Sequence, residues 1–201
     1  MVRIRAARAL ASFPRTPLDA SVLDLLAKAE KELLEMLYAR PDDWASHSNL
    51  GNYRMARGDS AGEMAVYKTS MKLRSDAVMP FVNASSLASQ DGNIQEAIGS
   101  LRHAASNHPE HGTVHLSLGL ALAEAGDSGG AGTALRIAMK DPVCAAQAAF
   151  NCAVLVGQRN PKEAVELIRF ALARDPSNLR HQEVLRDYEA RYIFPQMGKS
   201  A

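Results

Sequence analysis

Four histidines near the middle of the chain are the first candidates for chemistry: His103, His108, His111 and His115. His111 and His115 are four residues apart, a spacing that places two imidazoles on one face of a helix, as in some metal sites. No carboxylate or cysteine completes an obvious ligand set, and His108 and His111 flank Pro109, where we expect a solvated loop. The sequence therefore predicts neither a bound metal nor a cofactor.

The other reactive side chains do not assemble into a catalytic motif. The glycine-rich stretch at 126–132 lacks the lysine and the preceding strand that a phosphate-binding loop requires. Serine, cysteine and histidine form no recognisable nucleophilic triad. Cys144 and Cys152 would lie about 12 Å apart along one helix, beyond the ~7 Å limit for a disulfide. We therefore expect two small buried thiols and no enzyme activity.

Amide side chains recur at a fixed interval. Asn49, Asn83 and Asn151 occupy equivalent places in a pattern of 34 residues, with Ser117 at the fourth place. An amide carries both a donor and an acceptor, so a row of them can bind the backbone of an extended peptide whatever its side chains. The alternative is that these amides bond to carbonyls of neighbouring helices, and the sequence leaves both interpretations open.

Composition limits the classes of protein that can position such residues. The 201 residues are 47% hydrophobic and 22% charged, which is ordinary for a globular chain. A formal net charge of +1 argues against a dedicated nucleic-acid binder. The sequence contains no apolar run long enough to span a bilayer, so we expect no membrane insertion. Few aromatic residues, 5% of the total, favour close packing of helices on one another.

The 34-residue unit is typical of a pair of antiparallel helices. Three of the four units place glycine and then Asp or Asn at the same turn: Gly58-Asp59, Gly92-Asn93 and Gly126-Asp127. Glycine permits the left-handed conformation that ends the first helix, and the acid or amide can cap the second. Small residues at the centre of the first helix allow the two backbones to approach closely. The pattern thus predicts a row of helical hairpins.

Period, hairpin layout and the positions of small residues and proline resemble the tetratricopeptide repeat (TPR) family over about two thirds of the chain, from Trp44 to Asn178. The resemblance implies an all-α fold, a right-handed α-solenoid of TPR hairpins. We expect an N-terminal helical pair at 1–40, four repeats at 41–178, and a capping helix with a tail at 179–201. Glu63 and Ser70 depart from the family pattern, and His47 and His115 replace its usual aromatic residue.

The resemblance also implies which residues line a concave peptide-binding groove. They lie at the fifth, sixth, ninth and thirteenth positions of the first helices: Asn49, Asn52, Asn83, Ser86, Gln90, Leu116, Ser117, Leu120, Phe150 and Asn151. This groove is polar in the first two repeats and more apolar in the last two. The basic residues of a TPR carboxylate clamp are not present at the matching positions, where Ser48, Thr113 and Ser117 stand instead.

The sequence thus predicts a non-catalytic scaffold that binds a protein or peptide partner in its groove and binds no nucleic acid. Two alternatives remain open. One is a structural module that self-associates through its N-terminal helices. The other rests on a weaker similarity to the C-terminal TPR segment of bacterial multihaem c-type cytochromes, which implies a docking piece of a larger electron-transfer protein. The expected location is the cytoplasm for a free-standing chain and the periplasm for the exported cytochrome.

Overall fold

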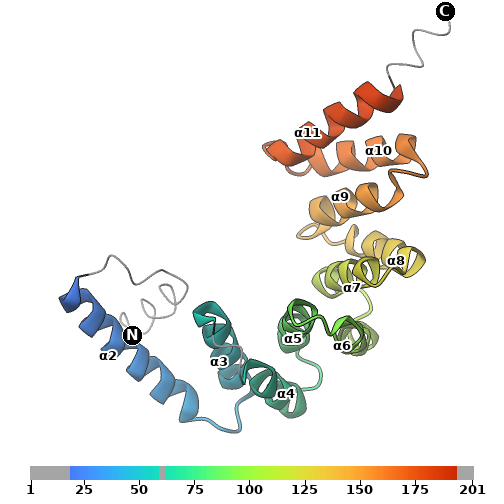
Figure 1. Ribbon diagram of the computed structural model, residues 1–201. Coiled ribbons are helices and arrows are strands. Elements are labelled where there is room, and N and C mark those ends of the chain that lie inside the picture. The colour runs from blue at the N-terminus through green and yellow to red at the C-terminus, as the bar shows by residue number, and fades with distance from the viewer. Residues whose placement is uncertain (1–18, 59–61, 194–201) are drawn as a thin grey trace, which may run out of the picture. The chain divides into compact units, whose positions relative to one another are not determined.

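The computed structural model describes residues 19–58 and 62–193 (Figure 1). These residues form helices and turns with no strand, so the expected all-α fold class is confirmed. The chain divides into two compact units, Met1–Leu87 and Ala88–Ala201. The boundary falls inside one helix, and the expected division at residues 40 and 178 stays a prediction.

Unit 1 contains α2 (Ala20–Tyr38), α3 (Trp44–Arg57), α4 (Glu63–Leu73) and most of α5 (Val78–Gln90). The α3 helix packs against both α2 and α4. Leu33 and Leu37 of α2 meet Leu50 and Tyr53 of α3 in one buried cluster. The first helix of the expected N-terminal pair falls at residues outside the described part of the chain.

Unit 2 continues the row of hairpins. Its helices are α6 (Ile94–Asn107), α7 (Gly112–Glu124), α8 (Ser128–Ala138), α9 (Ala145–Val156), α10 (Pro161–Leu172) and α11 (Leu179–Tyr188), followed by the π-helical turn η1 (Glu189–Ile193). Each helix packs against the next, and α7 to α11 lie stacked in chain order (Figure 1). Cys144 and Cys152 are both buried and free, as expected.

Glycine ends the first helix of three hairpins, as the sequence predicts. Gly58, Gly92 and Gly126 have φ values of 69°, 77° and 84°, in the left-handed region that other residues rarely adopt. Asp127 then caps α8 by accepting a hydrogen bond of 2.9 Å from the Gly130 N–H. The prediction of a side-chain cap at Asn93 is wrong, because its exposed side chain makes no cap bond and the backbone alone begins α6. The third predicted cap, Asp59, lies outside the described residues.

Small residues let the two helices of a hairpin approach closely. A Cβ added to Gly51 of α3 would lie 2.6 Å from the ring of Tyr67 on α4, and one added to Gly119 of α7 would lie 2.7 Å from Leu135 on α8. Tyr67 and Leu135 are both fully buried. The same pair of repeat positions therefore sets the separation of the helices in both hairpins.

Residues that depart from the family pattern make their own contacts between elements. The Ser70 hydroxyl on α4 donates a hydrogen bond of 2.7 Å to the Trp44 carbonyl at the start of α3. His47 and His115 place Nε2 2.8 Å from the carbonyls of Pro41 and Pro109, six residues earlier in each case. A proline carbonyl can only accept, so Nε2 carries the proton in both histidines. The imidazole thus ties the start of a hairpin to the end of the preceding one.

The last helix is held to unit 2 by a stacked pair of rings. His181 of α11 stacks on Phe150 of α9 with 4.2 Å between ring centroids, and both side chains are buried. The buried His181 Nδ1 has no hydrogen-bond partner among the described residues. Burial lowers the pKa of His181 below its ordinary value, an effect that nearby Asp175 opposes and Arg180 reinforces. The neutral imidazole is therefore the form that the folded chain favours.

Replacing Gly51 by alanine is expected to destabilise the chain by about 1–3 kcal/mol, because the new methyl group overlaps the Tyr67 ring. Gly99 on α6 is the matched control, since a Cβ there meets no atom within 4 Å. Gly99→Ala should stabilise by about 0.5–1 kcal/mol through the higher helix propensity of alanine. Urea unfolding followed by circular dichroism measures both, and equal effects of the two substitutions would contradict the close approach at Gly51.

The His181–Phe150 stack predicts a specific pH dependence. The folded-state pKa of His181 lies below the unfolded value, so its contribution to stability is complete above about pH 6.5 and is lost as the pH falls through the folded-state pKa. Phenylalanine at position 181 keeps a ring but cannot be protonated. The stability of the wild-type chain relative to His181→Phe should therefore fall between about pH 7.5 and pH 5. A difference that stays constant over this range in denaturant titrations would contradict a buried neutral imidazole.

Candidate functional site

Three helices of unit 2 leave exposed or half-buried side chains at equivalent repeat positions. We call these side chains the odd-helix surface: Thr113, Ser117 and Leu120 of α7; Gln147, Asn151 and Val154 of α9; Arg180, Val184 and Asp187 of α11. Equivalent members of α7 and α9 are 34 residues apart, and those of α9 and α11 are 33 apart. Leu120 and Val154 are 40% and 54% exposed, although most leucine and valine side chains of the unit are buried.

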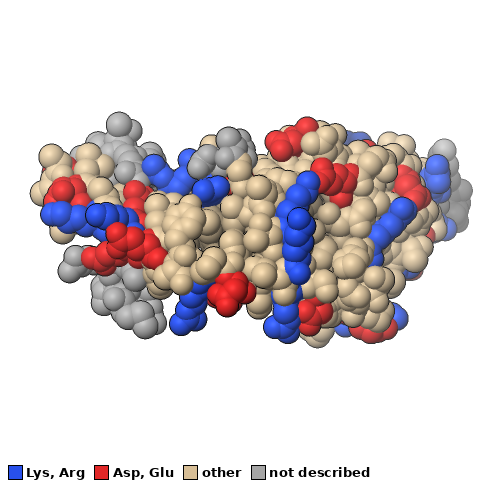
Figure 2. Space-filling view, turned by 90° about the horizontal axis from the view of Figure 1, so that it is seen from below, with Lys and Arg blue, Asp and Glu red and all other residues tan. Residues whose placement is uncertain are grey.

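Charge is nearly absent from two of these helices. The only charged residue of α7 and α9 together is Glu124, at the end of α7. The neighbouring α10 alone carries Lys162, Glu163, Glu166 and Arg169. On the face shown in Figure 2, basic and acidic side chains are interspersed and neither sign forms a broad patch. The odd-helix surface therefore offers amides, hydroxyls and apolar groups over α7 and α9, and charge only where α11 begins.

The predicted groove residues of unit 2 differ in how far they reach solvent. Leu120 is exposed, Ser117 and Asn151 are half-buried, and Gln90 is exposed at the end of α5. Leu116 and Phe150, at the fifth helical position, are only 7% and 6% exposed. Position five therefore faces the interior, and Leu116 packs in a core cluster that includes the Cys152 side chain.

The predicted groove residues of unit 1 include a hydrogen-bonded group. The Asn83 amide donates 2.6 Å to the Asn52 Oδ1, and the Tyr67 hydroxyl donates 2.7 Å to the same oxygen. Burial first, and then the charge of Glu63, raise the pKa of Tyr67 to about 12, so its hydroxyl keeps its proton. Asn52 and Asn83 are thus brought together, and they bond to each other as well as facing outward.

The remaining predicted amides and hydroxyls form no common ladder. The Asn151 amide donates 2.8 Å to the Gln147 carbonyl of its own helix, and the Ser86 hydroxyl donates 3.1 Å to the Val82 carbonyl. Asn49 is half-buried and makes no hydrogen bond within the described part of the chain. The contacts of Asn151 and Ser86 match the open alternative of bonds to helix carbonyls, and peptide binding by these residues stays a prediction.

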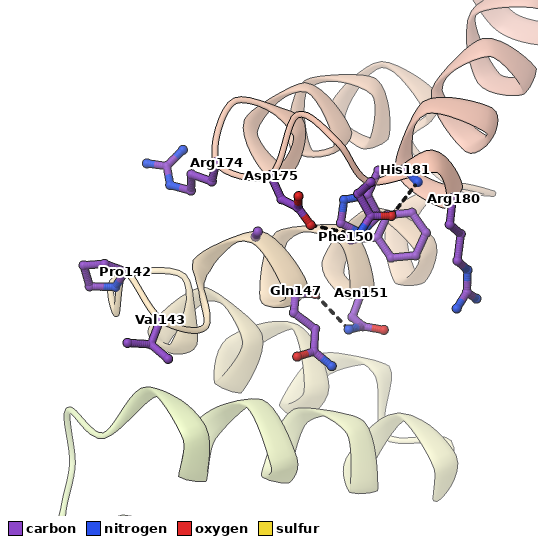
Figure 3. Close-up of a pocket in the computed structure, with 11 residues that line it drawn as sticks. Pro142, Val143, Gln147, Phe150, Asn151, Arg174, Asp175, Arg180 and His181 are labelled. Carbon is purple, nitrogen blue, oxygen red and sulfur yellow. Dashed lines mark hydrogen bonds between the residues drawn. The ribbon is translucent and has the colours of Figure 1, made fainter.

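A cavity of about 530 Å³ lies beside α9, where α11 and the loop before it approach (Figure 3). Its walls come from the α8–α9 loop, α9, the α10–α11 loop and the first turn of α11. They are formed by Pro142, Val143, Ala146, Gln147, Phe150, Asn151, Arg174, Asp175, Asn178, Arg180 and His181. In Figure 3, Gln147, Asn151 and Arg180 point to the same side of the molecule, so the cavity opens beside the odd-helix surface.

The two ends of the cavity differ in charge. Hydrogen bonds from Asn178 and Ser177 lower the pKa of Asp175 and keep this carboxylate ionised near the loop. Arg180 holds its guanidinium carbon 5.4 Å from the centre of the Phe150 ring. Arg174 turns to its own helix, where it stacks at 3.4 Å on Phe170 and donates to the Phe170 carbonyl. The cavity therefore combines an aromatic floor, free amide groups, and one charged group near each end.

These groups suit recognition better than bond-making chemistry. The cavity walls hold no nucleophile paired with a base, and His181, its titratable ring, is buried against Phe150. Across residues 19–58 and 62–193, no three His, Cys, Asp or Glu side chains are arranged to hold a metal ion. Within the same residues, none of the helices combines the length and the apolar character needed to cross a membrane.

Sequence reasoning missed several residues of this site. Gln147, Arg180, His181 and Val143 were absent from the predicted groove, although all four line the cavity. The repeat register carried the signal for two of them, because Gln147 is equivalent to Thr113 and Arg180 follows Gln147 after a shortened repeat of 33 residues. Nothing in the sequence indicates that Val143, in an irregular junction, would be 89% exposed.

Comparison with known proteins agrees with the hairpin architecture. Residues 83–142 match the model of the tetratricopeptide repeat family. Among curated proteins, none matches the chain.

Similar solved structures share the fold at low sequence identity. The TPR protein TTC0263 of Thermus thermophilus superposes with a TM-score of 0.65 at 17% identity, over 93% of this chain and 97% of that one. A crystal structure of MamA gives 0.60 at 20% identity over 71% and 89% of the two chains. YrrB, described as a TPR protein with an unusual peptide-binding site, gives 0.61 at 14% identity over 92% and 90%.

The hairpin geometry, the match over two repeats and the shared fold lead to one assignment. Residues 83–142 are tetratricopeptide repeats, and the chain that carries them is a TPR protein.

Proposed function

We propose that the chain is a protein-interaction scaffold and that the odd-helix surface of unit 2 binds an extended segment or a helix of a partner protein. The exposure of Leu120 and Val154 on a surface that is otherwise amide and hydroxyl carries this proposal. The two side chains occupy the same position of successive repeats, which places them next to each other on α7 and α9. They form the apolar centre that a partner can cover.

The energetics favour a partner whose contact face is also uncharged. Covering an exposed apolar side chain gains about 25 cal/mol for each Å² removed from water. A charged group pressed against α7 or α9 would lose hydration and find no counter-ion, since Glu124 is their one charge. The amide of Gln147 and the free oxygen of Asn151 can meet the backbone of an extended segment. The surface therefore selects by shape and apolar contact more than by charge.

The comparison with YrrB supports peptide binding as the type of interaction. That protein has the same fold and is described as having an unusual peptide-binding site. The resemblance is one of fold, so the position of the site on this chain rests on the exposed side chains of α7 and α9. A non-catalytic scaffold is also the general role of TPR domains.

The other expectations from the sequence stay predictions. Self-association through the N-terminal helices has some support from α2, where Leu25 and Met36 are 58% and 42% exposed. Nothing in the fold bears on the similarity to multihaem cytochromes or on the compartment in which the chain works. The predicted partner remains a protein or peptide, not a nucleic acid.

Replacing Leu120 and Val154 by lysine is expected to weaken partner binding at least about tenfold, because loss of central apolar contacts typically costs about 1–3 kcal/mol. Both side chains are exposed, so the change in stability should stay within about 0.5 kcal/mol. The probe is a set of peptides selected from a random library on the full wild-type chain. Fluorescence anisotropy measures their binding to both proteins.

The control variant carries the same two added charges on the even-numbered helices. Gln95 of α6 and Thr133 of α8 are exposed and lie outside the odd-helix surface, so Gln95→Lys with Thr133→Lys should bind the selected peptides as the wild type does. A library that yields no binder, or equal binding by the Leu120 and Val154 variant, would rule out this surface.

A further inference from the structure

We infer that the cavity beside α9 selects partner segments in which an acidic side chain follows or precedes an apolar one, and that Arg180 is the residue that reads the acid. This inference rests on the proposed function, because it assigns a sequence preference to the same surface. Its elements are an uncompensated guanidinium, an apolar floor next to it, and the lack of any other free cation among the residues that define this surface.

Arg180 has no acidic partner within the described part of the chain. It makes no hydrogen bond or ion pair there, and its guanidinium lies against the Phe150 ring at 5.4 Å. Other arginines of unit 2 are compensated. Arg136 pairs with Glu163 at 2.9 Å, and Arg191 pairs with Asp187 at 3.2 Å. Arg180 is thus a cation held over an aromatic face with its donors unused.

The position of Arg180 makes this free charge available to a partner. It occupies the place on α11 that Gln147 occupies on α9, and both line the cavity. Asp187 also belongs to the odd-helix surface, but Arg191 neutralises it. A segment lying across α7, α9 and α11 therefore passes uncharged residues and then meets one unpaired positive charge.

The carboxylate of Asp175 does not occupy Arg180. Both of its oxygens accept hydrogen bonds within the loop, from Ser177 at 3.1 Å and from Asn178 at 3.0 Å. In Figure 3 the rings of Phe150 and His181 lie between Asp175 and the Arg180 side chain. A carboxylate of the partner can therefore approach Arg180 on the side of the rings away from Asp175.

Apolar groups next to Arg180 define the second half of the preference. Val143 is 89% exposed at the opposite rim of the cavity, and Ala146 and Phe150 lie between it and Arg180 along α9. An aliphatic or aromatic side chain that enters here would cover Val143 and the edge of the Phe150 ring. The neutral state of His181 adds no second cation to attract another acid.

The test is a selection of random peptide segments on three full-length proteins: wild type, Arg180→Glu and Arg186→Glu. The segments are flanked by neutral linkers on both sides, so that they offer side-chain carboxylates and no terminal carboxylate. Arg186 is the matched control, because it is an exposed arginine of α11 that bonds to the Gln182 carbonyl and lies off the odd-helix surface. The readout is the charge composition of the selected sequences and their affinity.

We expect Asp and Glu to be enriched next to apolar residues on the wild type and on Arg186→Glu, and Lys and Arg to replace them on Arg180→Glu. Changing the acid of a selected peptide to its amide should weaken binding to the wild type about two- to fivefold, as for a partly exposed ion pair, and should not affect binding to Arg180→Gln. Binders that depend on Leu120 but show no acid preference would overturn the role of Arg180 alone. Failure to select any binder would overturn the proposed function as well.

Discussion

The structure depends on the close approach of two helices within each hairpin, which a missing side chain makes possible. Gly51 faces the Tyr67 ring and Gly119 faces Leu135, at the same repeat position in both units. This contact buries one side of the first helix and fixes its rotation about its own axis. The opposite side is then left to solvent at every repeat, so a surface for partners follows from the packing of the core.

That rotation explains why charge is distributed as it is. The first helices of unit 2 contact neighbours on most of their circumference, and a charge there would be buried without a partner. Their exposed stripe is narrow, and it carries Leu120, Val154 and small polar groups. Solubility is left to the second helices and to α11, whose arginines pair with Glu163, Glu189 and Asp187. The charge that remains unpaired at the edge of the stripe, Arg180, has a different meaning in this arrangement from an ordinary surface arginine.

The sequence predicts the hairpins well because the repeat states each local feature several times. Gly58, Gly92 and Gly126 mark turns that the structure reproduces, and Asp127 caps α8 as expected. Finer features were less accessible. The cap at Asn93 was wrong because backbone bonds satisfy the start of α6, and the depth of Leu116 and Phe150 depends on the rotation of each helix, which spacing alone does not give. The stack of His181 on Phe150 joins helices whose register shifts by one residue, so a strict period of 34 does not reveal it.

The central claim, that partners bind on the odd-helix surface of unit 2, is tested most directly by NMR of the methyl-labelled full-length chain with a selected peptide. The account predicts that the methyl signals of Leu120, Val154 and Val143 shift together on titration. Signals of Ile137 on α8 and Leu172 on α10, which are half-buried on the second helices, should stay in place. Shifts confined to the second helices, with Leu120 and Val154 unchanged, would contradict it.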